Sequence, residues 1–285
     1  MKLSIITINY NNCDGLRKTI ESVIGQTYSD FEYIIIDGGS KDGSTEIIKR
    51  YADKIDYWVS EPDKGIYNAM NKGIAAANGE YIQFLNSGDC LCSPSTIEAI
   101  IPSLKDVDII FAKFRYNDTL EIVNIPESIT MKTLYERSLP HPSSYIKREL
   151  LLHYPYDEKL RIVSDWKFWI QSIIFHNASY RILNNIIVNF DTTGISGTNK
   201  LLVQKEREIV LKDLLPSRIR KDYFHIVHGE RYDENSYDKL FIEIRNRRYR
   251  KLIYSMTIIV LRFISLFKKS AKFVINYPIK LNTKE

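Results

Sequence analysis

The sequence predicts an α/β fold in which a mostly parallel central sheet is flanked by helices and followed by a helical C-terminal extension. Short apolar, β-branched runs alternate with segments whose apolar residues fall at helical spacing. The alternation repeats roughly every 25 residues up to about residue 112, a rhythm that is typical of parallel strands joined by crossover helices. Beyond that point the rhythm loosens, and a hairpin and further strands are expected.

The expected strands are short and apolar, and the expected helices begin near capping residues or end at glycine. In chain order, the expected elements are a strand over 3–10, a helix over 14–25, a strand over 33–36, a helix from 44 through 51, a strand over 57–59, a helix over 66–77, a strand and turn over 79–89, a helix starting at 93–94, a strand over 107–111, a hairpin over 117–124, a strand over 142–147, a helix over 165–175 and a strand over 180–190.

Composition narrows the class of protein. A chain of 285 residues with 44% hydrophobic content can bury one substantial core with an appended subdomain. Its three cysteines, Cys13, Cys90 and Cys92, match neither a disulfide framework nor a zinc spacing, so reduced thiols and a cytosolic setting are expected. The apolar run at the N-terminus is too short for the core of a signal peptide, and secretion is therefore not expected.

Charge is distributed unevenly along the chain. Residues 241–285 hold eleven Lys and Arg against two Asp and Glu, whereas the remainder is mildly acidic. A basic tail favours an anionic partner. The body of the chain carries no nucleic-acid-binding motif, so nucleic acid is not an expected partner.

The basic tail also contains an apolar stretch. Twelve of the sixteen residues over 252–267 are apolar, Lys251 and two lysines flank them, and Arg262 interrupts them. A spanning helix needs about 20 residues, so the favoured interpretation is an interfacial helix within 241–275 whose basic flanks attract anionic lipids. A helix packed on the protein itself or on a partner, and a true membrane span, are the alternatives.

A carboxylate followed by glycines ends the second expected strand, at Asp37-Gly38-Gly39-Ser40. Ligands of open α/β sheets bind beyond the carboxyl ends of the strands, and glycines let a backbone approach them closely. Asp37 is therefore expected to accept a hydrogen bond from a base or ribose. Asp42, in contrast, is expected to cap the following helix. Neither a dinucleotide-binding fingerprint nor a P-loop occurs in the sequence.

Asp89 stands at the exit of the fourth expected strand, after Asn86-Ser87-Gly88. A turn aspartate that caps the next helix is the alternative, but Ser93 followed by proline is the better cap. Magnesium and manganese take one or two protein carboxylates and leave the other positions to phosphate oxygens and water. Asp89 is therefore predicted to hold a divalent metal against a nucleotide diphosphate.

Two further residues are candidates for the chemistry. Asp165 is flanked by bulky aromatic side chains that restrict the solvation of its carboxylate, which favours a general base. The alternative is that Ser164 or Asp165 caps the helix. His141 lies between two prolines on a stiff turn, where contact with a phosphate or an acceptor and simple solvation are both open.

Five short motifs follow one another in a fixed order. They are Thr7-Ile8-Asn9-Tyr10-Asn11, Gln26-Thr27-Tyr28, Asp37-Gly38-Gly39-Ser40-Lys41-Asp42-Gly43-Ser44, Asp63-Lys64-Gly65-Ile66-Tyr67-Asn68-Ala69-Met70-Asn71-Lys72-Gly73 and Phe84-Leu85-Asn86-Ser87-Gly88-Asp89. Together they resemble the family 2 glycosyltransferases with the GT-A fold, in particular bacterial surface-polysaccharide transferases of the colanic-acid and capsule type. The resemblance covers about residues 1–195. It implies a transferase domain over 1–200, with a nucleotide-sugar half at 1–112 and an acceptor half at 113–200, before a basic helical extension at 201–285.

The resemblance implies an inverting, metal-dependent hexosyltransferase that uses Mg²⁺ or Mn²⁺ and a nucleotide-diphosphate sugar, most simply a UDP-sugar. Asp89 would hold the metal, and Asp165 would deprotonate the acceptor hydroxyl. The implied nucleotide-sugar contacts are Thr7, Asn9, Asp37, Lys64, Asn71, Ser87 and His141. The Gln-x-x-Arg-Trp motif of processive members is absent from the sequence, which implies transfer of one sugar per encounter.

Two glycines depart from the family pattern, because Gly38 and Gly88 stand where many members have aspartate. Asp89 is thus the only carboxylate of the metal motif. The basic tail suggests a lipid-linked glycan acceptor and a peripheral position on the cytoplasmic face of the cell membrane. Two alternatives remain: a transferase-like protein that binds nucleotide sugar without turnover, and a nucleotidyltransferase, which usually has a Gly-rich basic loop that 6–12 lacks.

Overall fold

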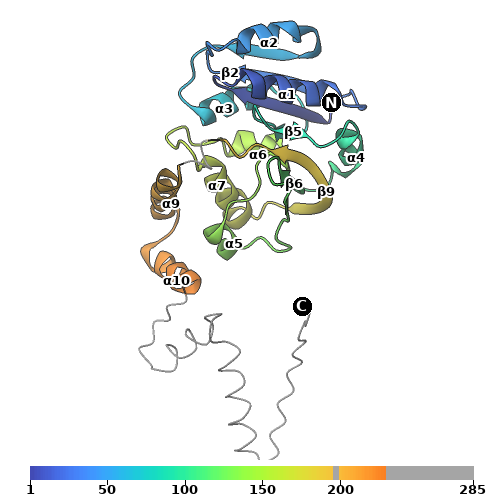
Figure 1. Ribbon diagram of the computed structural model, residues 1–285. Coiled ribbons are helices and arrows are strands. Elements are labelled where there is room, and N and C mark those ends of the chain that lie inside the picture. The colour runs from blue at the N-terminus through green and yellow to red at the C-terminus, as the bar shows by residue number, and fades with distance from the viewer. Residues whose placement is uncertain (195–198, 229–285) are drawn as a thin grey trace, which may run out of the picture. The chain divides into compact units, whose positions relative to one another are not determined.

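The computed structural model describes residues 1–194 and 199–228, and Met1–Tyr223 form one compact unit. Its described strands make a single sheet in the order β3-β2-β1-β4-β8-β6-β9-β5, with β7 paired to β6 (Figure 1). The strands are β1 (Leu3–Asn9), β2 (Glu32–Asp37), β3 (Tyr57–Ser60), β4 (Tyr81–Phe84), β5 (Cys90–Leu91), β6 (Ile109–Tyr116), β7 (Ile122–Val123), β8 (Ser144–Lys147) and β9 (Tyr180–Phe190).

The helices lie between the strands and after the last one. They are α1 (Cys13–Ile24), α2 (Ser44–Arg50), α3 (Ile66–Ala76), α4 (Thr96–Ile100), α5 (Met131–Glu136), α6 (Arg148–His153), α7 (Ser164–Trp169), α9 (Lys200–Leu214) and α10 (Ser217–His228), with the short turns η1 (Ala52–Lys54), η2 (Ile101–Ser103) and the π-helical η3 (Ile170–Phe175).

The first half of the chain forms the parallel sheet that the alternation predicts. β2, β1 and β4 run parallel in adjacent positions, with β3 parallel to β2 at the edge. β8 then pairs antiparallel to both β4 and β6, which makes β6 parallel to β4, and β9 runs parallel to β6. The α/β fold with a mostly parallel sheet is therefore confirmed.

Side chains alternate between the two faces of the sheet, and each face has its own core. On one face, Ile6 and Ile8 of β1 pack in the cluster that contains buried residues of α3, α5 and α7. On the other face, Leu3 and Ile5 pack in the cluster that contains buried residues of α1, α2 and α4. Figure 1 shows α1 and α3 on opposite sides of the blue strands. The central strands are consequently buried throughout, and their polar ends mark where a ligand can approach.

The observed elements differ from the predicted ones in several places. The helix expected at Ser93 begins at Thr96 instead, because the Ser93 hydroxyl accepts from the N–H of Ser95 and so shapes a preceding turn. The helix expected over 165–175 changes to a π-helical turn at Ile170. The sequence also predicted neither the two-residue strand β5 nor the short helices α5 and α6.

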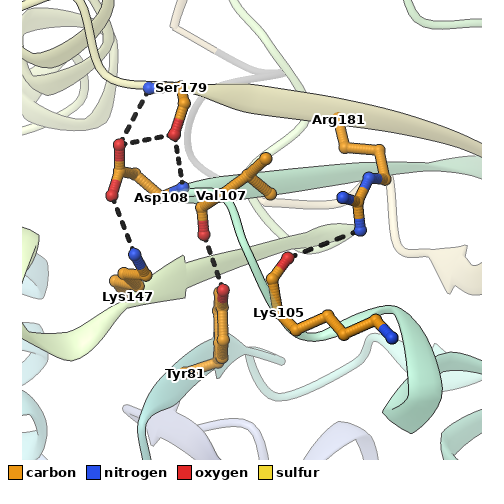
Figure 2. Close-up of polar contacts among 7 residues, drawn as sticks. All are labelled: Tyr81, Lys105, Val107, Asp108, Lys147, Ser179 and Arg181. Atoms are coloured by element: carbon orange, nitrogen blue, oxygen red, sulfur yellow. Dashed lines mark hydrogen bonds and ion pairs between the residues drawn. The ribbon is translucent and has the colours of Figure 1, made fainter.

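At the amino ends of β4 and β6, a polar cluster joins β4, β6, β8 and the segment just before β9 (Figure 2). Asp108 accepts hydrogen bonds from the N–H and hydroxyl of Ser179 at 2.9 and 2.7 Å, and Lys147 lies 3.1 Å from its other oxygen. The Tyr81 hydroxyl donates to the Val107 carbonyl at 2.6 Å. The cluster lies at the amino ends of the parallel strands, whereas the strand-end motifs lie at their carboxyl ends.

The C-terminal part of the described chain packs on α7. Lys167 of α7 forms an ion pair with Asp213 of α9 at 3.1 Å, so α9 belongs to the same unit although it follows the boundary expected at residue 200. Within residues 1–194 and 199–228, no helix combines the length and the apolar character that a membrane crossing needs. The predicted interfacial segment at 241–275 lies outside the described residues.

Candidate functional site

The carboxyl ends of β1, β2 and β4 gather the strand-end motifs at one edge of the sheet. Asn9 and Asp37 are direct partners in the parallel ladder between β1 and β2. β4 lies on the other side of β1, and its continuation leads into the turn that contains Asp89. The sequence motifs are therefore brought together by the register of three neighbouring strands.

Asp37 is held as a buried carboxylate by donors from three segments. Its oxygens accept from the hydroxyls of Ser40 and Ser60, both at 2.6 Å, and from Nδ2 of Asn9 at 2.7 Å. Burial opposes the ionisation of Asp37, but these hydrogen bonds outweigh it and hold its pKa below the usual range. Oδ1 of Asn9 is buried and has no partner in the described part of the chain. Asp37 and Asn9 thus place a fixed negative charge and an amide oxygen without a described partner at the carboxyl ends of β2 and β1.

Gly38 leaves room for a second carboxylate beside Asp37. A Cβ at position 38 would lie 2.5 Å from Oδ2 of Asp63, which comes from the loop after β3. Asp63 is tied down by the N–H of Gly65 at 2.8 Å. The sequence analysis quoted Asp63 within the fourth motif but gave it no role in the site. The space that a longer side chain at 38 would fill is thus taken by an aspartate from another loop.

Thr7 is placed differently from what the motif implies. It is fully buried, and its hydroxyl donates to the Leu85 carbonyl at 2.8 Å and lies 3.1 Å from the Tyr33 hydroxyl. Period-two alternation puts it on the same face of β1 as Leu3 and Ile5, inside the core with α1. In this structure Thr7 supports the packing between β1, β2 and the chain after β4, and does not reach the strand-end edge.

Two further residues were predicted to contact the nucleotide sugar, one in the loop before α3 and one on α3, and their surroundings differ. Lys64 is exposed, and its backbone N–H donates to Oδ1 of Asn68 at 3.2 Å. Asn71 instead clasps the loop before α7, because its amide donates to the Tyr156 carbonyl at 2.9 Å and accepts from the Tyr156 N–H at 3.1 Å. Glu158 accepts a further bond from Asn71 at 2.9 Å. Lys64 is therefore accessible to a ligand, whereas Asn71 holds a loop in place.

Ser87 and Gly88 form the turn that presents Asp89. The Ser87 carbonyl and hydroxyl lie 3.1 and 3.4 Å from Nδ2 of Asn12, the residue that caps α1. Gly88 has φ of +107°, a left-handed conformation that disfavours any other residue. Asp89 does not cap α4, since that helix begins seven positions later at Thr96 with Ser95 as its N-cap residue. The capping alternative for Asp89 is thus excluded.

Asp89 is a buried carboxylate beside a second carboxylate. Only 3% of the residue is exposed, and one oxygen accepts from the N–H of Asp191 at 2.9 Å. Burial raises the pKa of Asp89 to about 8; the N–H of Asp191 opposes this shift, and the Asp191 carboxylate adds to it. Asp191, just beyond β9, was missed by the sequence analysis. A divalent cation would compensate both charges.

The donor set of this turn fits a hard cation. Carboxylate and amide oxygens are the protein ligands that Mg²⁺ and Mn²⁺ prefer, and Oδ1 of Asn86 in the same turn is buried and unpartnered within the described chain. No group of three or more His, Cys, Asp or Glu that could hold a metal occurs in 1–194 and 199–228. A metal here would therefore take few protein ligands and share its shell with phosphate oxygens and water.

Asp165 lies in the first turn of α7 and makes a strong hydrogen bond with α3. The Tyr67 hydroxyl donates to its Oδ1 at 2.7 Å. Burial and the nearby charge of Asp165 hold the pKa of Tyr67 well above its usual value, so the phenol keeps its proton and remains a donor. The N-cap of α7 is Val163, with no side-chain cap bond. The alternative that Ser164 or Asp165 caps the helix is therefore excluded, and the Asp165 carboxylate is not used as a helix cap.

His141 is buried near Asp165, and the possibility of a solvated loop histidine is excluded. Its ring stacks on Phe84 of β4 with centroids 5.0 Å apart, and its Nε2 lies 2.7 Å from the Tyr156 hydroxyl. Burial lowers the pKa of His141, partly opposed by the charge of Asp165. His141 is therefore neutral near pH 7, a state suited to hydrogen bonding and packing more than to compensating phosphate charge.

The loop that leads into α7 is fixed from α9. Glu206, only 5% exposed, accepts hydrogen bonds from three successive backbone N–H groups, those of Arg161, Ile162 and Val163, at 2.8, 2.9 and 3.3 Å. The next residue of α9, Arg207, lies over the Trp166 ring at 4.7 Å. These contacts from α9 fix the start of α7 and therefore the position of Asp165. The sequence motifs gave no indication that this helix contributes to the site.

Comparison with known proteins agrees with this geometry. Residues 4–181 match the model of Glycosyl transferase family 2. An uncharacterised glycosyltransferase of Mycobacterium tuberculosis is 31% identical over 202 residues, covering 68% of this chain and 76% of the relative. A PGL/p-HBAD biosynthesis glycosyltransferase of Mycobacterium bovis is 25% identical over 217 residues, covering 71% of this chain and 81% of the relative.

Solved structures share the fold at low sequence identity. Residues 1–349 of TarS from S. aureus, in complex with UDP-GlcNAc, align with a TM-score of 0.59 and 16% identity, covering 87% of this chain and 77% of that one. Glucosyl-3-phosphoglycerate synthase from Mycobacterium tuberculosis, with Mn²⁺, UDP and glucosyl-3-phosphoglycerate, aligns with a TM-score of 0.53 and 17% identity, covering 76% and 81%. The architecture is thus that of the GT-A transferases, and the chain belongs to Glycosyl transferase family 2.

Proposed function

We propose that this glycosyltransferase transfers one hexosyl residue from a nucleotide-diphosphate sugar to an acceptor hydroxyl, with inversion and without processive extension. The observation that carries the proposal is the convergence of Asp37, Asp89 and Asp165 near the carboxyl edge of the sheet. Asp37 ends β2, Asp89 follows β4, and Asp165 is bonded to Tyr67 at the start of α3. Such an edge is where α/β sheets bind their ligands.

The donor would be bound through its nucleoside and its diphosphate. Asp37, a buried carboxylate, and Asn9, whose buried amide oxygen has no partner in the described chain, would contact the base or ribose at the ends of β2 and β1, and Lys64 is exposed for phosphate contact. A UDP-sugar is the first donor to test, since TarS binds UDP and UDP-GlcNAc, while a mannosyltransferase of Pyrobaculum calidifontis binds GDP-Man. Ser87 lies in the turn beside Asp89, close to where the diphosphate would lie.

Mg²⁺ or Mn²⁺ would be held at Asp89. Mn²⁺ accompanies the nucleotide in the mannosyltransferase and in glucosyl-3-phosphoglycerate synthase. When bound, a divalent cation supplies charge compensation for the leaving diphosphate. The burial of Asp89 and its proximity to Asp191 favour such a cation.

Asp165 would act as the general base of a single displacement. Its carboxylate takes the proton of the acceptor hydroxyl as that oxygen bonds to the anomeric carbon. The bond from that carbon to the donor phosphate breaks with its electron pair on the phosphate oxygen, and the nucleoside diphosphate leaves. Tyr67 orients the carboxylate through Oδ1, and Glu206 holds the start of its helix.

The acceptor would be a lipid-linked glycan of a cell-surface glycoconjugate, reached from the cytoplasmic face of the membrane. The basic composition of 241–285 supports this choice. The relative named for PGL/p-HBAD biosynthesis extends the range of acceptor classes beyond capsule and colanic acid. The acceptor half over 113–200 and the interfacial segment at 241–275 remain proposals within this scheme.

Release of nucleoside diphosphate tests the proposal. The purified full chain is incubated with Mn²⁺ or Mg²⁺, a panel of nucleotide sugars and lipid-linked acceptors, and product is measured for wild type, Asp165→Asn and Asp53→Asn. Asp165→Asn is expected to lower kcat roughly 10²- to 10⁴-fold, whereas the exposed Asp53 is a control that changes nothing. Full activity of Asp165→Asn contradicts the assignment of the base. Donor binding without release, in the presence of every acceptor, indicates a binding protein instead.

A further inference from the structure

The glycine at position 88 is explained by a residue that lies a hundred positions away. A Cβ at Gly88 would collide with Oδ2 of Asp191 and would lie 3.1 Å from its Cβ. Together with the left-handed φ of +107°, this contact excludes an aspartate at 88 while Asp191 keeps its position. The volume that a Cβ at 88 would occupy is already occupied by the Asp191 side chain.

The sheet sets this juxtaposition. β5 and β9 pair antiparallel, with Cys90 opposite Asn189 and Leu91 opposite Val188. Continuing that register past the ladder places Gly88 opposite Asp191. The N–H of Asp191 donates to Oδ1 of Asp89 at 2.9 Å, which secures the approach. Asp191 is therefore held by backbone pairing and does not depend on a mobile side chain to reach the turn.

The contacts of Asp191 leave one carboxylate oxygen facing the turn. Its Oδ1 accepts from the N–H of Thr193 at 2.9 Å, a local turn contact. Its Oδ2 is the atom nearest the missing Cβ of Gly88. In the described part of the chain, no basic side chain pairs with Asp191 or with Asp89 within 4.0 Å. Two carboxylates, one of them 97% buried, thus adjoin each other without a compensating cation.

We propose that Asp191 supplies the second protein carboxylate of the divalent-metal site, in place of the aspartate that Gly88 cannot carry. Buried charges of like sign are costly unless an opposite charge joins them. Mg²⁺ and Mn²⁺ take one or two carboxylates, so Asp89 and Asp191 complete the protein share of the shell. The metal's role toward a diphosphate rests on the proposed function, but binding of the metal ion itself does not.

Direct titration with Mn²⁺ alone tests the assignment. Binding of Mn²⁺ to the full chain is measured by calorimetry and by the electron paramagnetic resonance signal of the free ion. Asp191→Ala and Asp191→Asn are each expected to weaken binding about tenfold or more, since even residues outside the ligand shell change metal affinity roughly 10- to 100-fold. The matched control is Asp118→Asn, an exposed aspartate that accepts from the Thr192 hydroxyl at 3.3 Å on the same surface.

Thermal unfolding supplies a readout that separates a ligand from a structural residue. Asp191→Asn keeps the backbone N–H that binds Asp89 and removes a like charge, so without metal its Tm should equal or exceed that of wild type. The rise in Tm on adding Mn²⁺ should shrink, because stabilisation by a ligand follows its affinity.

Wild-type Mn²⁺ affinity in both Asp191 variants, or the absence of Mn²⁺ binding in wild type, overturns the proposal. If Mn²⁺ binding depends on Asp191 while no nucleotide sugar is turned over, the metal site stands and the proposed function fails. If nucleotide sugar is turned over but Mn²⁺ binds equally well without Asp191, the proposed function stands and the assignment of Asp191 as a metal ligand fails. The two conclusions are therefore tested separately.

Discussion

Two aspartates at opposite edges of the same sheet have contrasting surroundings. At the amino edge, Asp108 is surrounded by donors: Ser179 gives two hydrogen bonds and Lys147 an ion pair (Figure 2). Burial opposes its ionisation, but these contacts outweigh it and hold the pKa of Asp108 below its usual range. At the carboxyl edge, Asp89 is more deeply buried, meets one backbone N–H and a second carboxylate, and has its pKa raised to about 8.

The difference distinguishes Asp108, a carboxylate with a structural role, from Asp89, whose charge no described residue compensates. Asp108 ties β6, β8 and the start of β9 together, and every contact it makes favours the ionised form. Asp89 has no such compensation, so its ionised form is costly until a cation arrives. A buried carboxylate without basic partners at the ligand edge of an α/β sheet is a stronger indication of function than its position in a motif alone.

For the two aspartates compared here, the largest expected effect is that of Asp89→Asn on transfer. Removing the metal ligand should lower nucleoside-diphosphate release roughly 100-fold or more, because charge compensation by a metal contributes several kcal/mol to the transition state. The metal-free Tm should stay about the same, because the raised pKa of Asp89 leaves its carboxyl mostly protonated near pH 7 and the substitution then removes no charge. Activity is measured with Mn²⁺ at saturating donor, and unfolding in a chelator. A fall in Tm with activity retained would make Asp89 a structural residue like Asp108.

Tyr67→Phe extends the comparison to the carboxylate of Asp165. Loss of the hydrogen bond to Oδ1 should lower kcat roughly 10- to 150-fold with an unchanged KM for the donor, because hydrogen bonds to charged groups contribute about 1.5–3 kcal/mol. The matched control is Tyr51→Phe, which removes a hydroxyl that donates to the exposed Glu21 carboxylate at 2.9 Å. Equal kinetics of the two variants would show that Tyr67 does not orient the base.

Asp108→Asn should affect stability and leave catalysis unchanged. The amide loses the charge that Ser179 and Lys147 contact, and the free energy of unfolding should fall by about 1–3 kcal/mol. Most of this comes from Ser179, since the ion pair with Lys147 is partly exposed and surface pairs contribute little. Urea unfolding measures the loss, and kcat at 15–20 °C below Tm, roughly the range in which the folded state dominates, should equal that of wild type. Reduced kcat in the folded variant would contradict a purely structural role.

The smallest expected effect is the pH dependence of that stability difference. Folding lowers the pKa of Asp108 from its ordinary value of 3.8, so its contribution is fully present above the pKa of the unfolded chain and is lost as pH falls through the lower folded value. The gap in unfolding free energy between wild type and Asp108→Asn should therefore be constant near neutral pH and narrow on acidification below about pH 4. Urea titrations across this range measure the gap. A gap that widens in acid would contradict a lowered pKa of Asp108 in the folded protein.

The sequence was a good guide to the first half of the fold and to the motifs. β1, β2, α3 and β9 lie within one or two residues of their predicted bounds, because uninterrupted apolar runs and helical spacing are local signals. Short elements such as β5 and α6 carry too few residues to show a period. Thr7 shows a limit of motif reasoning, since alternation along β1, which places it with Leu3 and Ile5, indicates a buried side chain.

The residues that complete the site could not be predicted because they depend on long-range packing. Gly38 and Gly88 looked like losses of carboxylates, yet Asp63 and Asp191 fill the space beside them from distant loops. No local pattern links Glu206 with the N–H groups of the loop before α7. A glycine in place of an expected aspartate shows only that a side chain is missing at that position. The tertiary structure is needed to show which residue fills the space.

The pairing of Asp191 with Asp89 also bears on the order in which the protein assembles. The two residues are 102 positions apart, and contacts of such separation form only after the entropy of closing a long loop has been overcome. A chain that has formed β1 to β4 possesses the nucleoside end of the site but still lacks Asp191. The second carboxylate arrives when β9 docks on β5 and β6, so the rate at which Mn²⁺ binding appears during refolding would report the completion of the sheet.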